Sequence, residues 1–239
     1  LLRHRLTTAL SWLAVTLGVA LALAVQVIHD AAVTELGRGV RTLAGQADLQ
    51  VLGPRDGFPE SLLDDLLALP EVAEASPVVE VEARRLDGPV AEHDRQTLRV
   101  VGLDAFRVAA IQPRLLPRPA PGAGRLAMLD QDAVFPTPAA LQALGLKVGD
   151  TIRLQAGEAE LPWRVAGVAG KSAGVAAVGG GLPALAVADI GAVQWRFGWL
   201  GRLSRIDLRF AEGVEVDAVR ARIEPLLPLG PAKLALMLK

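Results

Sequence analysis

The sequence predicts an α+β protein in which one N-terminal transmembrane helix is followed by an extracytoplasmic domain. We expect that domain to consist of two βαβ-type halves with a β-rich subdomain inserted between them. Two observations carry this prediction. Residues 6–28 contain neither an ionisable residue nor a proline, and residues 46–239 alternate short strand-like runs with amphipathic helix-like segments.

Residues 6–28 are long enough to span a membrane. As an α-helix, about 23 residues rise about 34 Å, whereas the hydrocarbon core of a bilayer is about 30 Å thick. Arg3 and Arg5 precede the segment and Asp30 follows it, so the positive-inside rule predicts a cytoplasmic N-terminus and an extracytoplasmic remainder. A cleaved signal peptide is one alternative, but its apolar region is normally about 7 to 15 residues long. A buried core helix is the other, but such a helix usually keeps a polar stripe.

The rest of the chain divides into three parts. Apolar residues keep helix-like spacing through residues 29–44, so we take residues 1–45 as the transmembrane helix and a stalk. Residues 46–105 and 184–239 form the two α/β halves, which we expect to share one sheet. Residues 106–183 form the inserted β-rich subdomain, and residues after about 30 lie outside the membrane.

Composition excludes several classes of function. The 25 Lys and Arg residues and 26 Asp and Glu residues are interspersed, giving a net charge of −1, so the basic footprint of a nucleic-acid-binding protein is missing. The chain has no cysteine, which leaves no disulfide framework and no thiol chemistry. Because the chain begins with Leu1 and not with methionine, we expect it to be a fragment of a longer protein.

The first half reads as strand, helix, strand, strand. Residues 47–52 alternate like a strand, and a helix is predicted to open at Pro59 and to close at Pro70. Residues 79–84 alternate valine or alanine with charged residues, which predicts a half-buried strand, and residues 96–103 form the next. A strand, helix and strand in this order are typical of a βαβ unit.

The insertion begins with a proline-rich loop over residues 113–124. Thr137 is the predicted N-cap of a helix that ends at Gly145. Two alternating runs, residues 151–155 and 161–168, predict a hairpin around a glycine turn. Pro162, inside the second run, predicts an edge strand or a bulge.

The last part repeats the order of the first. Residues 185–188 predict a strand, Asp189 caps a helix that ends at Gly198, and residues 203–210 predict a further strand. In that strand we expect Ile206, Leu208 and Phe210 to face the core and Arg205, Asp207 and Arg209 to face water. A final helix is predicted from Asp217 to Pro228.

No pattern of catalytic chemistry is recognisable, and we predict no catalytic, cofactor-binding or metal-binding residue. The three histidines, His4, His29 and His93, are dispersed. Gly-Lys-Ser at 170–172 resembles the end of a phosphate-binding loop, but that loop needs a glycine where this chain has Val165. Trp195, Phe197 and Trp199 form an aromatic run, for which we expect core or subdomain packing; contact with a membrane interface or a partner is the alternative.

Five stretches, taken in order, resemble the extracytoplasmic core domain of MacB/FtsX-type ABC transporter permeases. HRLTTALSWLAVTLGVALALAV followed by LAGQADLQVLG resembles the first membrane helix and entry strand. PAALQALGLKVGDTIRL followed by WRVAGVA resembles the helix, turn and hairpin, and ALAVADIGAVQWRFG resembles the segment that leads back toward the membrane. The resemblance implies a porter-like subdomain, formed by the two halves, and a distal inserted subdomain.

The resemblance also implies a function. The chain would be a non-enzymatic permease subunit in the bacterial inner membrane, with further membrane helices, a second permease copy or a homologous permease as a dimer partner, and a periplasmic partner. ATP hydrolysis would occur in a separate or fused cytoplasmic ATPase, and the outer domain would transmit ATP-driven motion to export or extract a lipoprotein, lipid, peptide or drug. Two alternatives remain open: a single-span anchored binding or scaffold protein, and a regulatory permease that activates an envelope hydrolase.

Overall fold

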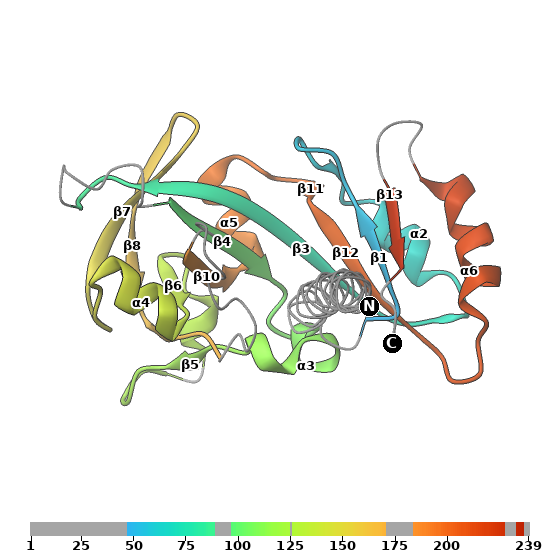
Figure 1. The fold of residues 1–239 in the computed structure, drawn as a ribbon, viewed down its shortest axis with the longest axis horizontal. Coiled ribbons are helices and arrows are strands. Elements are labelled where there is room, and N and C mark those ends of the chain that lie inside the picture. Colours follow the sequence, from blue (N-terminus) through green and yellow to red (C-terminus); the bar gives the residue numbers. More distant parts are fainter. Residues whose placement is uncertain (1–46, 89–96, 125, 171–183, 228–232, 237–239) are drawn as a thin grey trace, which may run out of the picture. The chain divides into compact units, whose positions relative to one another are not determined.

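The computed structural model describes residues 47–88, 97–124, 126–170, 184–227 and 233–236 (Figure 1). The predicted transmembrane helix and stalk, His93, and the Lys-Ser pair at 171–172 lie outside these residues. Within them, no helix is both long enough and apolar enough to cross a membrane. The described residues all belong to one compact unit.

A nine-stranded sheet forms the framework, in the order β13-β1-β12-β3-β4-β10-β6-β8-β7. Its strands are β1 (Leu49–Leu52), β3 (Val72–Arg85), β4 (Thr97–Leu103), β6 (Ala133–Pro136), β7 (Thr151–Ala156), β8 (Ala159–Val165), β10 (Ala184–Asp189), β12 (Arg205–Phe210) and β13 (Lys233–Leu236). Both predicted halves therefore contribute to one sheet, as expected. Strands of residues 106–183 also pair into it, and the division into subdomains stays a prediction.

One end of the sheet has the split βαβ arrangement of a ferredoxin-like fold. β1 and β3 are both antiparallel to β12, which lies between them, so β1 and β3 are parallel to each other. Helix α2 (Leu62–Leu67) connects them. In the same way, helix α6 (Val216–Ile223) connects β12 to β13, and β1 lies between those two strands.

The other end of the sheet closes into a ring. β3 pairs with β4, and the pairing continues through β10, β6, β8 and β7. β7 then pairs with β3 at Arg84 and Arg85. β3 is thus the one strand of this sheet that belongs to both ends, and Figure 1 shows it running the length of the sheet.

β3 is longer than the sequence predicts, with 14 residues instead of the six residues 79–84. Pro77 made the first half of this strand unrecognisable, because proline cannot donate to a strand ladder. In the fold, Ser204 N donates to Val78 O and Glu80 N bonds Ser204 Oγ, so the even-numbered residues direct their backbone groups toward β12. The missing N–H of Pro77 points away from β12, and β4 pairs only from Val78 onward, so no ladder bond is lost.

Local end signals located two helices correctly. The side chain of Thr137 accepts a hydrogen bond from Ala140 N at the start of α4 (Pro138–Leu144), and Gly145 ends it with a positive φ of 62°. The side chain of Asp189 likewise accepts a hydrogen bond from Ala192 N at the start of α5 (Ile190–Phe197), and Gly198 ends that helix with φ 72°.

Two other helices differ from their predicted bounds. The prediction that Pro59 opens a helix is wrong, because Pro59 pairs with Arg202 in the small sheet of β2 (Phe58–Pro59) and β11 (Arg202–Leu203), and α2 begins at Leu62. Helix α6 ends at Ile223 and not near Pro228, because Pro225 lies in a following 3-10 turn, Glu224–Leu226.

Among the described strands of the insertion, β7 and β8 form the predicted hairpin, and Gly157 in its turn has φ 58°. Pro162 pairs only with Arg153 on β7, because β8 contacts β6 no earlier than Arg164. β8 is therefore locally an edge strand at this proline, as predicted. The loop 113–124 contains a 3-10 turn, Pro113–Leu115, and β5 (Arg118–Pro119), which pairs with β9 (Gly167–Val168).

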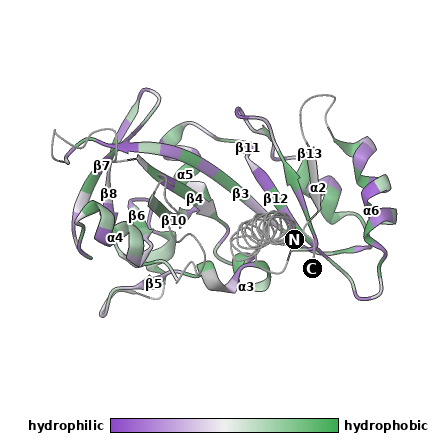
Figure 2. Ribbon diagram, viewed as in Figure 1, coloured by the Kyte–Doolittle hydropathy of each residue, from purple (hydrophilic) through white to green (hydrophobic). Residues whose placement is uncertain are grey.

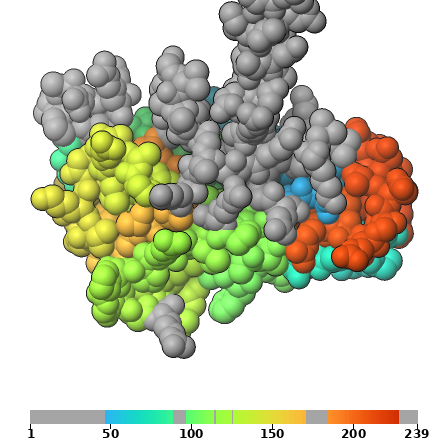
Figure 3. Space-filling model, turned by 60° about the horizontal axis from the view of Figure 1, so that its bottom comes forward, coloured from blue at the N-terminus to red at the C-terminus, as the bar shows by residue number. Residues whose placement is uncertain are grey.

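The two faces of the sheet are covered differently. One face carries the larger core, where α2, α4, α5 and α6 bury side chains such as Leu66, Val193 and Ile223. On the other face, α3 (Val108–Ile111) and the turns beside it cover Val78, Leu103 and Phe135. Figure 2 shows the green and purple alternation along the strands, and Figure 3 shows the green segment around α3 on the side turned toward the viewer.

Candidate functional site

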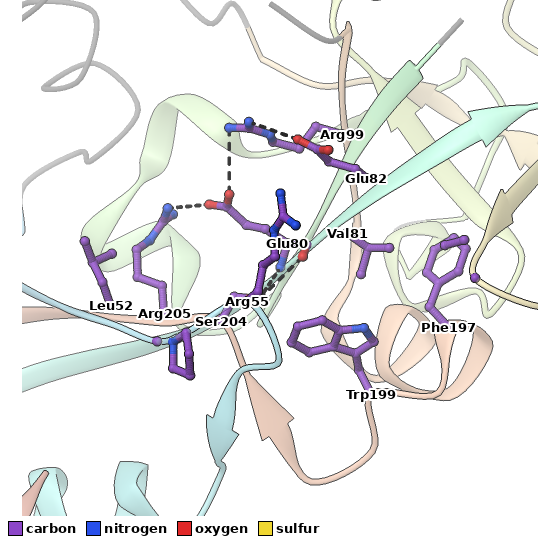
Figure 4. A pocket seen from close by; sticks show the side chains of 14 residues that line it. Leu52, Arg55, Glu80, Val81, Glu82, Arg99, Phe197, Trp199, Ser204 and Arg205 are labelled. Atoms are coloured by element: carbon purple, nitrogen blue, oxygen red, sulfur yellow. Dashed lines mark hydrogen bonds and ion pairs between the residues drawn. The ribbon is translucent and has the colours of Figure 1, made fainter. Parts of the chain in front are cut away.

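An open groove of about 700 Å³ lies along one edge of β3, in the gap between the two strands, β12 and β7, that pair with this edge (Figure 4). β12 stops pairing with β3 at Val78, and β7 begins to pair at Arg84. Residues 79–83 therefore have a strand partner on the β4 side only, among the described residues. The loop after β1 lines one end of the groove through Leu52 to Arg55, and the tip of the β7–β8 hairpin lines the other through Ala156 and Gly157.

The backbone of β3 is incompletely paired in this groove. At one end Glu80 N donates to Ser204 Oγ at 2.9 Å, and at the other end Leu86 N donates to Arg153 O at 2.9 Å. Because the backbone groups of a strand alternate between its two edges, the N–H and C=O of Glu82 point to the same edge of β3 as the N–H groups of Glu80 and Leu86. Neither group has a hydrogen-bond partner in the part of the chain that the structure describes.

Charged side chains form a ladder on one side of β3. Arg205 pairs with Glu80, Glu80 lies 3.8 Å from Arg99, and Arg99 lies 3.6 Å from Glu82. Exposure increases along the ladder, from 16% for the Arg205 side chain to 66% for Glu82. Pairing thus neutralises these four charges locally. Arg55, which also lines the groove, is exposed and has no ion pair with any described residue.

Behind the ladder lies a fully buried carboxylate, Asp207. It accepts hydrogen bonds of 2.6 Å from the side-chain amides of Gln50 and Gln112, and its Oδ1 lies 2.9 Å from Arg205 Nε. The prediction that Arg205 and Asp207 face water is therefore wrong. The segment from α3 to Gln112 covers this face of β12, which the alternation of residues 203–210 alone did not show.

Burial raises the pKa of Asp207, because an ionised carboxylate loses its hydration away from water; Arg205 and the Gln50 amide act in the opposite direction. Burial alone would lower the pKa of Arg205, but the carboxylates of Asp207 and Glu80 reverse this and the pKa is raised. Arg205 therefore stays charged, and it links the buried carboxylate to the ladder in the groove.

Aromatic and aliphatic side chains form the opposite side of the groove. Val81, Phe197 and Trp199 lie on the side of β3 away from Glu80 and Arg205 (Figure 4). Phe197 is 8% exposed, and its ring is stacked on Trp163 with 5.4 Å between centroids. The groove thus offers an apolar side and a charged side, separated by the free edge of β3.

The aromatic run divides between two roles. Phe197 and Trp199 pack against the larger core, as predicted. For Trp195 the prediction of core packing is wrong, because this side chain is 67% exposed on the outer face of α5. The alternative, contact with a membrane interface or a partner, stays open for Trp195.

A free strand edge beside paired charges and an apolar side is an arrangement suited to binding. No group of three or more His, Cys, Asp or Glu residues able to hold a metal ion occurs among the described residues. The sequence predicted no site residue, so the ladder and Asp207 were missed. One available signal was the alternation of Glu80 and Glu82 on one strand with Arg99 on the next, which places opposite charges on one sheet face.

Comparison with known proteins agrees with this architecture. The family described as MacB-like periplasmic core domain matches residues 8–226. The chain belongs to this family. MacB-like periplasmic core domains are parts of ABC-transporter-type permeases, so the predicted resemblance is confirmed.

Among solved structures, the periplasmic region of MacB from Actinobacillus actinomycetemcomitans matches with a TM-score of 0.51 at 12% identity, covering 79% of this chain and 84% of that one. The extracellular domain of the noncanonic ABC-type transporter YknZ from Gram-positive bacteria matches with a TM-score of 0.47 at 12% identity, covering 73% of this chain and 87% of that one. A domain of a putative permease protein from Porphyromonas gingivalis matches with a TM-score of 0.44 at 13% identity, covering 75% of this chain and 83% of that one. No curated protein sequence matches. At these identities, the likeness to the MacB region shows the fold alone.

Proposed function

We propose that this MacB-like core domain belongs to a permease subunit of an ABC transporter and transmits ATP-driven motion from the membrane to the extracytoplasmic side. The domain performs no chemistry of its own. A cytoplasmic ABC ATPase supplies the energy, and a second copy or a homologous permease completes the transporter in the bacterial inner membrane. The substrate is exported or extracted, and lipoproteins, lipids, peptides and drugs are the classes to test.

The observation that carries this proposal is the pairing of the first and last described strands of the sheet. β1 and β13 are adjacent and antiparallel, and Leu49 at the start of β1 lies opposite Leu236 at the end of β13. The chain therefore enters and leaves the domain at one end of the sheet. Such a connection suits a domain held between two membrane helices, because a movement of either helix acts on two neighbouring strands.

The sheet gives this movement a continuous path. From β1, the ladder of backbone hydrogen bonds runs through β12 to β3. β3 is paired to β12 in its first half and to β4 and β7 in its second half. A displacement at β1 is thus carried by a hydrogen-bonded sheet to the ring without crossing a flexible linker, which is what a mechanical relay requires.

The proposal is tested by removing the domain at its paired ends. Because Leu49 and Leu236 are strand partners, a short glycine-serine linker from residue 48 to residue 237 bridges the deletion without stretching the chain. We expect the permease with this deletion, coexpressed with its ATPase, to assemble and to hydrolyse ATP but to lose export. The measurements are ATP turnover of the purified complex in lipid nanodiscs and substrate export by cells.

A full chain carrying an exposed substitution, Arg118→Ala, is the matched control, and we expect it to keep both activities. The proposal is wrong if the deletion changes neither export nor ATP turnover relative to that control.

A further inference from the structure

We propose that the groove along β3 binds the C-terminal end of an extended polypeptide, which adds as a short antiparallel strand to the free edge of residues 79–83 and places its terminal carboxylate at Arg55. This inference concerns a binding site and stands independently of the transport mechanism proposed above.

The first argument is the free backbone edge. Glu82 presents an N–H and a C=O toward the groove, and neither is bonded within the described residues. In the described part of the chain, Glu80 O accepts a hydrogen bond only from the Ser204 hydroxyl, at 3.5 Å. Unpaired strand edges are templates for an added strand, and main-chain hydrogen bonds supply the affinity in this mode of peptide recognition.

The second argument is direction. Three described strands, β4, β7 and β12, pair with β3, and all of them run antiparallel to it. A peptide that continues the line from the end of β7 toward the start of β12 is also antiparallel to β3. Its N-terminal part then enters beside Gly157, and its C-terminal end arrives near Ser204 and the loop 52–55.

The third argument is length, which favours a chain end over an internal segment. The unpaired stretch of β3 contains five residues, 79–83, or roughly 17 Å of strand at 3.3 Å per residue. Ser204 lies in line with the stretch at one end, where its N–H is already bonded to Val78 O. An internal segment has to leave the edge at both ends, whereas a chain end has to leave it at one end only.

The fourth argument is charge. Among the charged residues that line the groove, Glu80, Glu82, Arg99 and Arg205 are paired with one another. Arg55 has no ion pair in the described part of the chain, and it lies at the end of the groove where the peptide carboxylate arrives. A guanidinium and a carboxylate form strong charge-assisted hydrogen bonds. Because side chains of a strand alternate, the peptide's other residues meet Trp199 on one side and the ladder on the other.

The test uses the purified full chain in detergent micelles and a fluorescein-labelled six-residue peptide that alternates valine and threonine and ends in a free carboxylate. Fluorescence anisotropy measures its Kd. We expect binding, and we expect amidation of the peptide's C-terminus to weaken it roughly tenfold, since a charged contact is lost. Arg55→Ala has the same effect, and in that variant amidation causes no further loss. Arg118→Ala, an exposed arginine outside the groove, leaves the Kd unchanged.

A second variant tests the strand edge itself. Glu82→Pro removes the free N–H without removing a bond of the β3–β4 ladder, because that N–H points away from β4. We expect it to weaken binding at least tenfold, whereas Glu82→Ala, which keeps the N–H, has little effect. Methylation of the peptide's central amides should act like Glu82→Pro.

Several results overturn the proposal. The first is an absence of peptide binding at protein concentrations up to about 1 mM, a range in which single-site peptide affinities are measurable. The second is equal affinity for the amidated and the free-carboxylate peptide. The third is unchanged binding of the peptide to the Glu82→Pro variant. Loss of self-association in Glu82→Pro, with no peptide binding to the wild-type chain, also overturns it, because the edge is then an interface between two copies of this protein.

Discussion

Replacing Asp207 with alanine should destabilise the domain far more than an ordinary surface substitution does. The carboxylate is 0% exposed and contacts three groups: the Gln50 and Gln112 amides at 2.6 Å and Arg205 at 2.9 Å. Its removal leaves a guanidinium, 16% exposed, with Glu80 as its remaining ion-pair partner among the described residues. Breaking a buried ion pair by removing one partner costs about 3–5 kcal/mol.

The expected shift in unfolding temperature follows from that free energy. A change of 1 kcal/mol lowers Tm by about 2–4 °C in a domain of this size, so Asp207→Ala should lower Tm by roughly 6–20 °C. Thermal unfolding of the detergent-solubilised chain, followed by tryptophan fluorescence, measures the shift.

Glu74→Ala is the matched control on the neighbouring strand. Glu74 is 38% exposed and lies 4.0 Å from Arg209, and an exposed pair of this kind contributes less than about 1 kcal/mol. A double variant, Arg205→Met with Asp207→Leu, removes both charges and should recover the part of the loss that comes from the unpaired guanidinium, but not the part that comes from the two glutamine amides left without an acceptor. If Asp207→Ala costs no more than Glu74→Ala, the carboxylate is solvated in the native state and the buried network described above is wrong.

Two further comparisons test packing at positions where the structure gives a sharp contrast. Gly57→Ala should destabilise the domain more than Gly213→Ala does. Both glycines have a positive φ, 72° and 79°, so the backbone strain is similar. An added Cβ at Gly57 would lie 2.6 Å from Leu203 O, whereas an added Cβ at Gly213 would meet nothing within 4 Å. Phe197→Ala should cost about 3–5 kcal/mol because it opens a cavity in the core, whereas Trp195→Ala should change stability by less than about 0.5 kcal/mol. The same thermal unfolding assay measures all four variants, and equal shifts within either pair contradict the structure.

The parts of this fold that the sequence predicted are those set by local chemistry. Thr137 and Asp189 cap helices with their own side chains, and Gly145 and Gly198 end those helices in a conformation that glycine adopts readily. Such signals span only a few residues, so they are visible without knowledge of the rest of the chain.

The candidate site could not be predicted because its contacts are long-range. Gln50 and Gln112 are 157 and 95 residues from Asp207 in the sequence. The alternation of residues 203–210 shows that Asp207 and Ile206 face opposite sides of the strand, but not that α3 and Gln112 cover the polar side. The groove likewise arises only when β7 closes the ring on β3, more than 65 residues away along the chain.

The position of the groove connects the two proposals made for this domain. β3 joins the ferredoxin-like end to the ring, and the stretch 79–83 is where neither β12 nor β7 supports its edge. A relay that bends will bend most easily where a strand has a partner on one side only. A peptide bound there pairs with β3 between the end of β7 and the start of β12, and it therefore opposes bending at that point. We accordingly expect a bound peptide to lower ATP-driven export while leaving basal ATP hydrolysis unchanged, and we expect Glu82→Pro to abolish this inhibition because it prevents the peptide from pairing.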